Sequence, residues 1–197
     1  KNWSVGKDKN GKDKRLKLNF DAVDYQSTVW VNGTKVAEHT GGYTGFSADI
    51  TDSLKGGGPQ EIVVAVTDRT GPNQPKGKQS TNPGGIVYTP SSGIWQTVWM
   101  EPVAPAAIDS LTTTPNIDTG RLAVTVNSAK ASGNARITAV ARDRKGKVVG
   151  TVTGPANREL SLQVKNQRLW SPDDPYLYDL DVSLTDGRSK DSVESYF

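Results

Sequence analysis

Short segments in which apolar and polar residues alternate, each bounded by turn residues, recur along this 197-residue chain. A period of two places every second side chain on one face of a β-strand, and no stretch sustains the 3.6-residue period of a helix. The clearest hairpin joins residues 28–31 to residues 35–38 through Asn32-Gly33, a dipeptide that favours a tight turn between strands. The pattern therefore predicts an all-β fold without long helices.

The amino-acid composition limits the kind of hydrophobic core that this chain can form. Hydrophobic residues make up 34% of the chain, which is low for one thick core, while 20 glycines and 11 prolines supply many turns. β-Sandwiches suit such a composition because one face of many strands meets water. The chain has no cysteine, which excludes disulfides and thiolate metal sites. His39 is the single histidine, so no histidine cluster can bind a metal, and we interpret it as a turn residue.

The formal net charge is +3, and the basic excess lies in residues 7–17, which we interpret as a solvated hairpin that turns at Asn10-Gly11. No basic stripe with interleaved aromatic residues follows, so we expect no nucleic-acid partner. No apolar run approaches the roughly 20 residues that span a bilayer, so we expect no membrane partner. Lys1 has no Met before it and Phe197 ends a predicted strand, which indicates a fragment of a longer protein. Localisation therefore stays open between cytoplasm, periplasm and secretion.

The strand pattern occurs in two series. The first series comprises residues 16–20, 28–31, 35–38, 46–50, 61–67 and 94–101. After a linker rich in Pro and Ala at 103–107, the second comprises residues 108–111, 122–126, 137–141, 148–149, 160–164 and 178–184. Several short strands within about 90 residues are typical of an immunoglobulin-like sandwich. We therefore predict two domains, residues 1–103 and 104–197.

Two features of the first series bear on function. Residues 61–67 are nearly continuously apolar, which predicts a central strand, and a long polar loop follows at 68–83. Loops of this length in compact domains are functional or disordered. Residues 84–93 form a second loop rich in Gly, Pro and Ser, which leads into the predicted strand at 94–101. The two loops are the first place to look for a binding surface.

Several motifs carry a family resemblance. Phe20-Asp-Ala-Val-Asp-Tyr25, Val29-Trp-Val-Asn-Gly33 and His39-Thr-Gly-Gly-Tyr43 resemble the sugar-binding domain of glycoside hydrolase family 2, and Ser92-Gly-Ile-Trp-Gln-Thr-Val98 continues the match. Leu169-Trp-Ser-Pro172, close to a Pro-Tyr-Leu-Tyr sequence, resembles the signature late in the family's immunoglobulin-like domain. The resemblance spans almost the whole chain. It implies a jelly-roll (galactose-binding-like) β-sandwich, clipped at its N-terminus, followed by an immunoglobulin-like β-sandwich.

The family contains β-galactosidases, β-glucuronidases and β-mannosidases, and the resemblance implies that a TIM barrel with two catalytic glutamates comes next. Nothing in this chain corresponds to that barrel. We therefore expect the non-catalytic part of an enzyme that hydrolyses terminal β-glycosides, with β-galactosides favoured, and we expect this part alone to be inactive. It would support the missing barrel, its protein partner, and form one wall of the barrel's active site. It would contact carbohydrate through the intact enzyme. The alternatives are an autonomous carbohydrate-binding module and a purely structural interaction module.

We expect no catalytic residue, no metal and no cofactor in this chain. A retaining glycosidase needs two carboxyl groups about 5–5.5 Å apart. Two acidic pairs occur, Asp21 with Asp24 and Asp173 with Asp174. We interpret both as turn carboxylates that accept hydrogen bonds from local backbone amides.

Eight residues on or beside the two loops are candidates for contact with a sugar or with the barrel, because hydroxyl, amide and charged groups suit sugar hydroxyls and a Trp ring can stack on a sugar. They are Tyr88, Ser91, Ser92, Trp95, Asp68, Arg69, Lys78 and Gln79. A solvated loop or packing on the missing domain is the favoured alternative for the loop residues. For Trp95 and Trp30 the favoured alternative is a core or domain-interface position, and Trp170 is expected in the second core. An acidic residue that reaches the substrate in β-galactosidases of the family has no counterpart in residues 84–90.

Overall fold

The structure is a computed structural model that describes residues 5–7 and 13–197. Contacts divide the chain into two compact units, whose main parts are Lys14–Pro102 (unit 1) and Val103–Phe197 (unit 2). Across the described ranges the regular elements are β-strands and one 3-10 turn at Thr51–Ser53, which confirms the all-β prediction. Nothing helical in these ranges has the length and apolarity to cross a bilayer. The predicted turn at Asn10-Gly11 lies outside the described residues.

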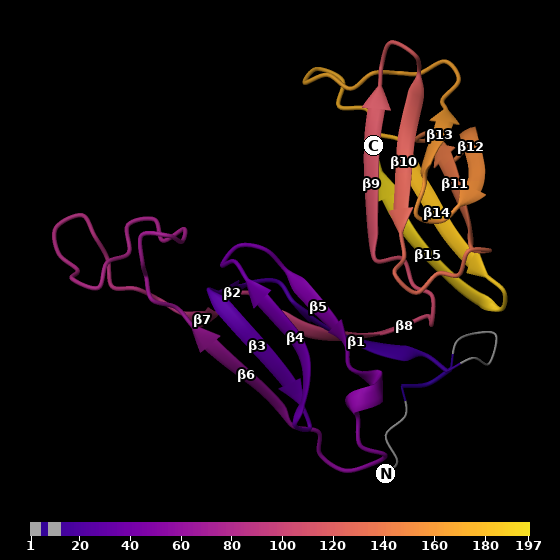
Figure 1. The fold of residues 1–197 in the computed structure, drawn as a ribbon. Helices are drawn as coiled ribbons and strands as arrows, with labels where there is room; N and C mark the ends of the chain where they lie inside the picture. The colour runs from indigo at the N-terminus through magenta and orange to yellow at the C-terminus, as the bar shows by residue number, and fades with distance from the viewer. Residues whose placement is uncertain (1–4, 8–12) are drawn as a thin grey trace. The chain divides into compact units, whose positions relative to one another are not determined.

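The described part of unit 1 contains eight strands in three small sheets (Figure 1). The strands are β1 (Arg15–Phe20), β2 (Val23–Asp24), β3 (Gln26–Val31), β4 (Thr34–Thr40), β5 (Phe46–Asp49), β6 (Ile62–Thr67), β7 (Gly93–Ile94) and β8 (Val98–Val103). The sheet orders are β5-β1-β8, β4-β3-β6 and β2-β7. Alternate residues of β1, β3 and β5 form one core, which contains Leu16, Leu18, Phe20, Val29, Val31, Ala48 and Ile50. Both three-stranded sheets therefore bury one face against the same core.

The hairpin between β3 and β4 forms as predicted. Asn32 and Gly33 have φ angles of 50° and 83°, and positive φ at both central positions is what a type I′ turn requires. The Asn32 side-chain amide donates to the Ser53 carbonyl at 2.8 Å, which ties the turn to the 3-10 segment. Asn therefore fits the first turn position for its tolerance of positive φ and for its side-chain hydrogen bond.

Three expectations for unit 1 are wrong. Residues 94–101 do not form one strand, because β7 pairs with β2 while β8 joins the sheet of β1. Between them the chain changes sheets, and the Thr97 carbonyl accepts a hydrogen bond from the Asp21 amide at 3.0 Å. The apolar strand β6 is an edge strand, not a central one, because β3 is the only strand that pairs with it among the described residues. His39 lies in β4 and not in a turn, and its ring stacks on Phe46 at 4.6 Å.

Unit 2 is a two-sheet β-sandwich, as predicted for the second half (Figure 1). Its strands are β9 (Ser110–Asn116), β10 (Arg121–Asn127), β11 (Arg136–Arg142), β12 (Val148–Pro155), β13 (Glu159–Gln163), β14 (Asp179–Asp186) and β15 (Ser189–Tyr196). The sheet orders are β13-β10-β9 and β12-β11-β14-β15. Both sheets contribute to one core, in which Leu122, Ile137, Leu162, Leu180 and Leu184 are almost completely buried.

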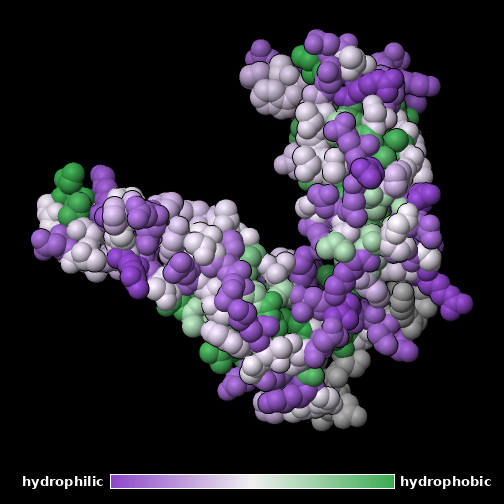
Figure 2. Space-filling model, viewed as in Figure 1, coloured by the Kyte–Doolittle hydropathy of each residue, from purple (hydrophilic) through white to green (hydrophobic). Residues whose placement is uncertain are grey.

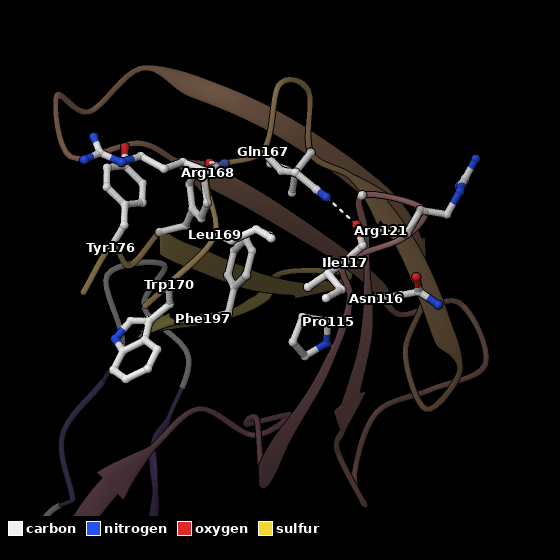
Figure 3. A pocket seen from close by; sticks show the side chains of 13 residues that line it. Pro115, Asn116, Ile117, Arg121, Gln167, Arg168, Leu169, Trp170, Tyr176 and Phe197 are labelled. Atoms are coloured by element: carbon white, nitrogen blue, oxygen red, sulfur yellow. Dashed lines mark hydrogen bonds between the residues drawn. The ribbon is translucent and has the colours of Figure 1, made fainter. Parts of the chain in front are cut away.

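Trp170 does not fill this core. Its side chain is 57% exposed and lies beside an apolar groove of about 240 Å³, together with Leu169, Ile117 and Phe197 (Figure 3). The loop that carries Trp170 connects β13 to β14, and the aliphatic side chains of the strands already fill the interior. The expectation that Trp170 occupies the core is therefore wrong.

Trp170→Ala should lower the free energy of unfolding of unit 2 by less than about 1 kcal/mol, because more than half of the ring already meets water. A buried Trp would cost about 3–5 kcal/mol on the same change. Urea unfolding followed by circular dichroism measures the difference. Leu162→Ala, which truncates a side chain with 0% exposure, is the comparison and should cost about 2–5 kcal/mol. Equal losses for both variants would contradict the exposed position of Trp170.

Candidate functional site

A pocket of about 230 Å³ in unit 1 collects polar and aromatic side chains from distant parts of the chain. Its lining residues are Asp24, Tyr43, Gln79, Ser91, Ser92, Gly93 and Trp95. The antiparallel pairing of β2 with β7 sets Asp24 opposite Gly93, and this pairing brings the loop before β7 beside the end of β2. We call this cavity the Asp24 pocket.

Asp24 is the buried acid of the pocket. Its residue exposure is 8%, and the carboxylate oxygen Oδ1 has no hydrogen-bond partner among the described residues. Burial, and then the negative charge of Asp68, raise the pKa of Asp24 above its ordinary value. The interpretation of Asp24 as a turn carboxylate is therefore wrong. Oδ1 itself is packed against Gly42, but Asp24 as a residue lines the pocket, so its carboxyl group is suited to form a hydrogen bond with a ligand hydroxyl.

The glycine at position 42 lets Asp24 and Trp95 lie close together. A Cβ atom on Gly42 would lie 2.5 Å from Oδ1 of Asp24, so only glycine leaves room for the carboxylate. The Gly42 carbonyl accepts a hydrogen bond from the Trp95 indole at 2.7 Å, and the Tyr43 ring meets Trp95 edge to face at 5.6 Å. Trp95 is 51% exposed and lies outside the core of unit 1. Its half-exposed ring and the buried carboxylate form two sides of one pocket.

Asp68 is a second acid close to the pocket, and its carboxylate is well hydrogen-bonded. The Ser92 hydroxyl donates to Oδ2 at 2.7 Å, while the Thr70 amide and the Gln74 side-chain amide donate to Oδ1. Partial burial raises the pKa of Asp68, but the hydrogen bonds from Thr70, Ser92 and Gln74 outweigh it, so that the pKa lies below its ordinary value. Asp68 therefore stays ionised to a lower pH than Asp24, and Asp24 is the first of the two acids to take up a proton as the pH falls.

The structure brings together only some of the predicted site residues. Four of them line the Asp24 pocket, namely Gln79, Ser91, Ser92 and Trp95. Gln79 shapes the loop, since its side-chain oxygen accepts the Ser91 amide at 2.6 Å. Asp68 contacts the pocket through Ser92, whereas the other three predicted residues lie outside the pocket lining: Tyr88, Lys78 and Arg69.

The ring of Tyr88 is 63% exposed, and the backbone of Tyr88 forms an isolated parallel bridge with Gln79. Sequence reasoning missed Asp24 and Tyr43 as members of the pocket. One sequence signal could have pointed to Asp24: a charged residue directly follows two apolar residues, Ala22 and Val23. Both of these are 0% exposed in the structure. The signal for Tyr43 is its place at the end of the His39-Thr-Gly-Gly-Tyr43 motif, which resembles the sugar-binding domain.

Asp21 and Asp174, from the two acidic pairs, are bound outside the pocket. Asp21 accepts a hydrogen bond from the Trp99 indole at 3.1 Å, and Asp174 receives two hydrogen bonds from the guanidinium of Arg168 at 2.7 and 2.8 Å. Both carboxylates contact side chains from other parts of the chain or loop, and not the local amides that we expected. Within the described ranges, no three His, Cys, Asp or Glu residues group closely enough to bind a metal ion.

Two family models match the chain. The model of the sugar binding domain of glycosyl hydrolases family 2 matches residues 3–79, and a second model of glycosyl hydrolases family 2 matches residues 106–197. The chain belongs to glycosyl hydrolase family 2. Asp24, Tyr43 and Gln79 lie within the sugar-binding match, and the other four lining residues of the Asp24 pocket come from the loop and strand that follow it in the chain.

This family 2 chain is similar to enzymes with two kinds of name. It is 29% identical to the β-glucuronidase of Canis lupus familiaris over 93% of its own length and 31% of that protein. It is 28% identical to the β-galactosidase of Thermoanaerobacter pseudethanolicus over 90% of its length and 24% of that protein. Among solved structures, the FMN-binding β-glucuronidase from Facaelibacterium prausnitzii L2-6 matches with a TM-score of 0.72, at 25% identity, over 93% of this chain and 29% of that chain. The chain therefore spans less than a third of each of these relatives.

Proposed function

We propose that this family 2 chain is the non-catalytic β-sandwich part of a glycoside hydrolase, and that the Asp24 pocket forms one wall of the sugar site of the parent enzyme. The observation that carries the proposal is one pocket whose lining includes both the buried acid Asp24 and the half-exposed Trp95. Small-ligand sites combine an apolar or aromatic surface with a few well-placed polar groups, and this pocket has both. The chain would also support the barrel of the parent enzyme.

The substrate class that the pocket favours is a neutral terminal sugar, a β-galactoside, over a β-glucuronide. Asp24 lines the pocket, Asp68 lies next to it, and neither Lys nor Arg is among the lining residues. The carboxylate of a glucuronide would face like charge there, and juxtaposed like charges are unfavourable. A galactose hydroxyl, by contrast, can form a hydrogen bond with the carboxyl group of Asp24.

Within this function the chain's own residues bind and orient the sugar. The hydrogen bond to Asp24 would fix one hydroxyl, and the Trp95 ring would cover an apolar sugar face and exclude water from it. Interactions that strengthen in the transition state raise kcat as well as affinity. Asp68 does not act as an acid or base in this proposal, because its two oxygens already accept hydrogen bonds from three donors. The two carboxyl groups of the reaction would come from the rest of the parent enzyme.

The test uses the parent enzyme that carries this chain. Asp24→Ala should lower kcat/KM for an aryl β-galactoside by about 10- to 100-fold, the scale of one lost charged hydrogen bond. Glu61→Ala removes an exposed carboxylate of the same unit and should leave kcat/KM unchanged. The 197-residue chain alone should hydrolyse neither β-galactoside nor β-glucuronide. An unchanged kcat/KM in the Asp24→Ala variant would overturn the sugar-wall function.

The half-exposed Trp95 also supports a second candidate function, that of a carbohydrate-binding module that acts without a barrel. Titration of the 197-residue chain with galactose distinguishes the two functions. A saturable change of the Trp95 indole signal at low millimolar galactose favours the binding module. If the pocket is one wall of a site that the barrel completes, the chain alone should bind galactose only weakly, with a Kd of tens of millimolar or more.

A further inference from the structure

Unit 1 contains a second, larger cavity of about 500 Å³. Its lining residues come from the start of β3, the end of β4 and the loop after β6, and we call it the Arg69 cavity. The residues that matter for its chemistry are Tyr25, Gln26, Thr40, Arg69, Asn73 and Gln74. Its volume lies in the usual range for small-ligand sites, roughly 300–1,000 Å³.

The Arg69 cavity adjoins the Asp24 pocket. Asp24 and Tyr25 are consecutive, and each lines a different one of the two cavities. Asp68 joins them as well, since its carboxylate accepts hydrogen bonds from Ser92 of the Asp24 pocket and from Gln74 of the Arg69 cavity. Asp68 therefore connects one lining residue of each cavity.

The two cavities differ in charge. The Arg69 cavity is lined by one cation and by no acidic residue. The side chains of Gln26, Arg69 and Asn73 form no hydrogen bond or ion pair with other described residues, so their donors are available to a ligand. Lys76, on the same loop, adds positive charge, and its ammonium donates to the Thr70 carbonyl at 3.4 Å. Asp68, which adjoins the cavity through Gln74, is already bound by three protein donors.

We propose that the Arg69 cavity is a second carbohydrate subsite, and that it takes a sugar unit with an anionic group next to the neutral sugar in the Asp24 pocket. A guanidinium binds carboxylates and sulfates through two parallel hydrogen bonds, while amide and hydroxyl side chains suit sugar hydroxyls. The inference rests on the proposed function for the neutral unit. It names the substrate class as an acidic oligosaccharide whose terminal sugar is neutral, with the charge supplied by a uronic acid or by a sulfate ester.

The test is a nuclear magnetic resonance titration of the 197-residue chain. The ligands are glucuronic acid, galactose 6-sulfate, galactose and sodium sulfate. The Arg69 Nε–H and the Asn73 side-chain amide report on the Arg69 cavity, and the Trp95 indole N–H reports on the Asp24 pocket. An acidic sugar should shift the first two signals with a Kd of about 1–10 mM, a usual scale for one sugar unit. The stronger of the two acidic ligands identifies carboxylate or sulfate as the preferred group.

Arg69→Gln should weaken binding of the acidic sugar at least about 10-fold, whereas Lys78→Gln, which removes a cation of the same loop outside both cavities, should not. No shift of the Arg69 and Asn73 signals at 50 mM acidic sugar overturns the proposal, and so does equal binding of sodium sulfate, which would show an anion site and not a sugar site. Equal losses in the Arg69 and Lys78 variants overturn it as well. If galactose does not shift the Trp95 indole signal, the result contradicts only the proposal for the Asp24 pocket. Failures of the two proposals are therefore distinguishable.

Discussion

Asp24→Asn is expected to increase the free energy of unfolding of unit 1 by about 1–2 kcal/mol at pH 7 and to leave it unchanged below pH 4. Asp24 is buried, its Oδ1 has no hydrogen-bond partner among the described residues, and an unsatisfied buried charge costs free energy. Burial raises the pKa of Asp24 in the folded chain, so the folded state favours the protonated acid. The free energy of unfolding is therefore highest below pH 3.8, the pKa of the acid in the unfolded chain. It falls as the pH rises through the raised pKa of Asp24 in the folded chain. Asparagine carries no charge and avoids this loss.

Urea unfolding at several pH values between 4 and 8 measures the effect. The advantage of the Asp24→Asn variant should grow with pH across this range. Glu61→Gln is the matched control, because it removes one exposed carboxylate of the same unit and should change stability by less than about 0.5 kcal/mol at each pH. A pH-independent advantage would contradict the burial of a titrating acid at position 24.

Gly150→Ala is expected to destabilise unit 2 by about 2–3 kcal/mol. Gly150 lies in β12, where this strand passes close to β13 of the other sheet. A Cβ atom there would lie 2.4 Å from the carbonyl oxygen of Gln163 and 2.6 Å from a methyl carbon of Leu162. The backbone oxygen cannot rotate away, so the strands must separate, and overpacking of this kind costs about 1–3 kcal/mol or more.

Thermal or urea unfolding followed by circular dichroism checks the loss. Gly133→Ala is the control in the same unit, because a Cβ atom at that position meets nothing within 4 Å. The control should change stability by less than about 1 kcal/mol. A loss at Gly150 no larger than at Gly133 would show that β12 and β13 do not approach as closely as the structure indicates.

A stabilising Asp24→Asn change would also bear on function. Natural chains keep buried, unsatisfied polar groups mainly where a ligand or a reaction needs them, and removal of such a group often raises stability at the cost of activity. Unit 1 has further exposed apolar surface, such as Ile86 at 75% exposure, in the loops between β6 and β7, and Figure 2 shows an apolar patch at the tip of these loops.

The sequence by itself determined the strand-rich fold, the turn at Asn32-Gly33 and the family, because alternation and turn chemistry are local properties that a short segment carries wherever it lies. It also selected the two loops in which Ser92 and Gln79 line a pocket, and Trp95 just beyond them. The sequence analysis wrongly predicted interior positions for Trp170 and for the strand at 61–67. The apolar character of a residue does not show which other residues cover it in the folded chain.

Only the tertiary structure decided which residues form the Asp24 pocket. Asp24 resembles a turn acid until β2 pairs with β7 and sets it opposite Gly93, which lies far along the chain. The close packing of Gly42 against Asp24, and the hydrogen bond from Trp95 to Gly42, likewise join segments that no local pattern relates. Burial, pKa and charge of a pocket arise from such non-local contacts, because each depends on which side chains and how much water surround a group in the folded chain.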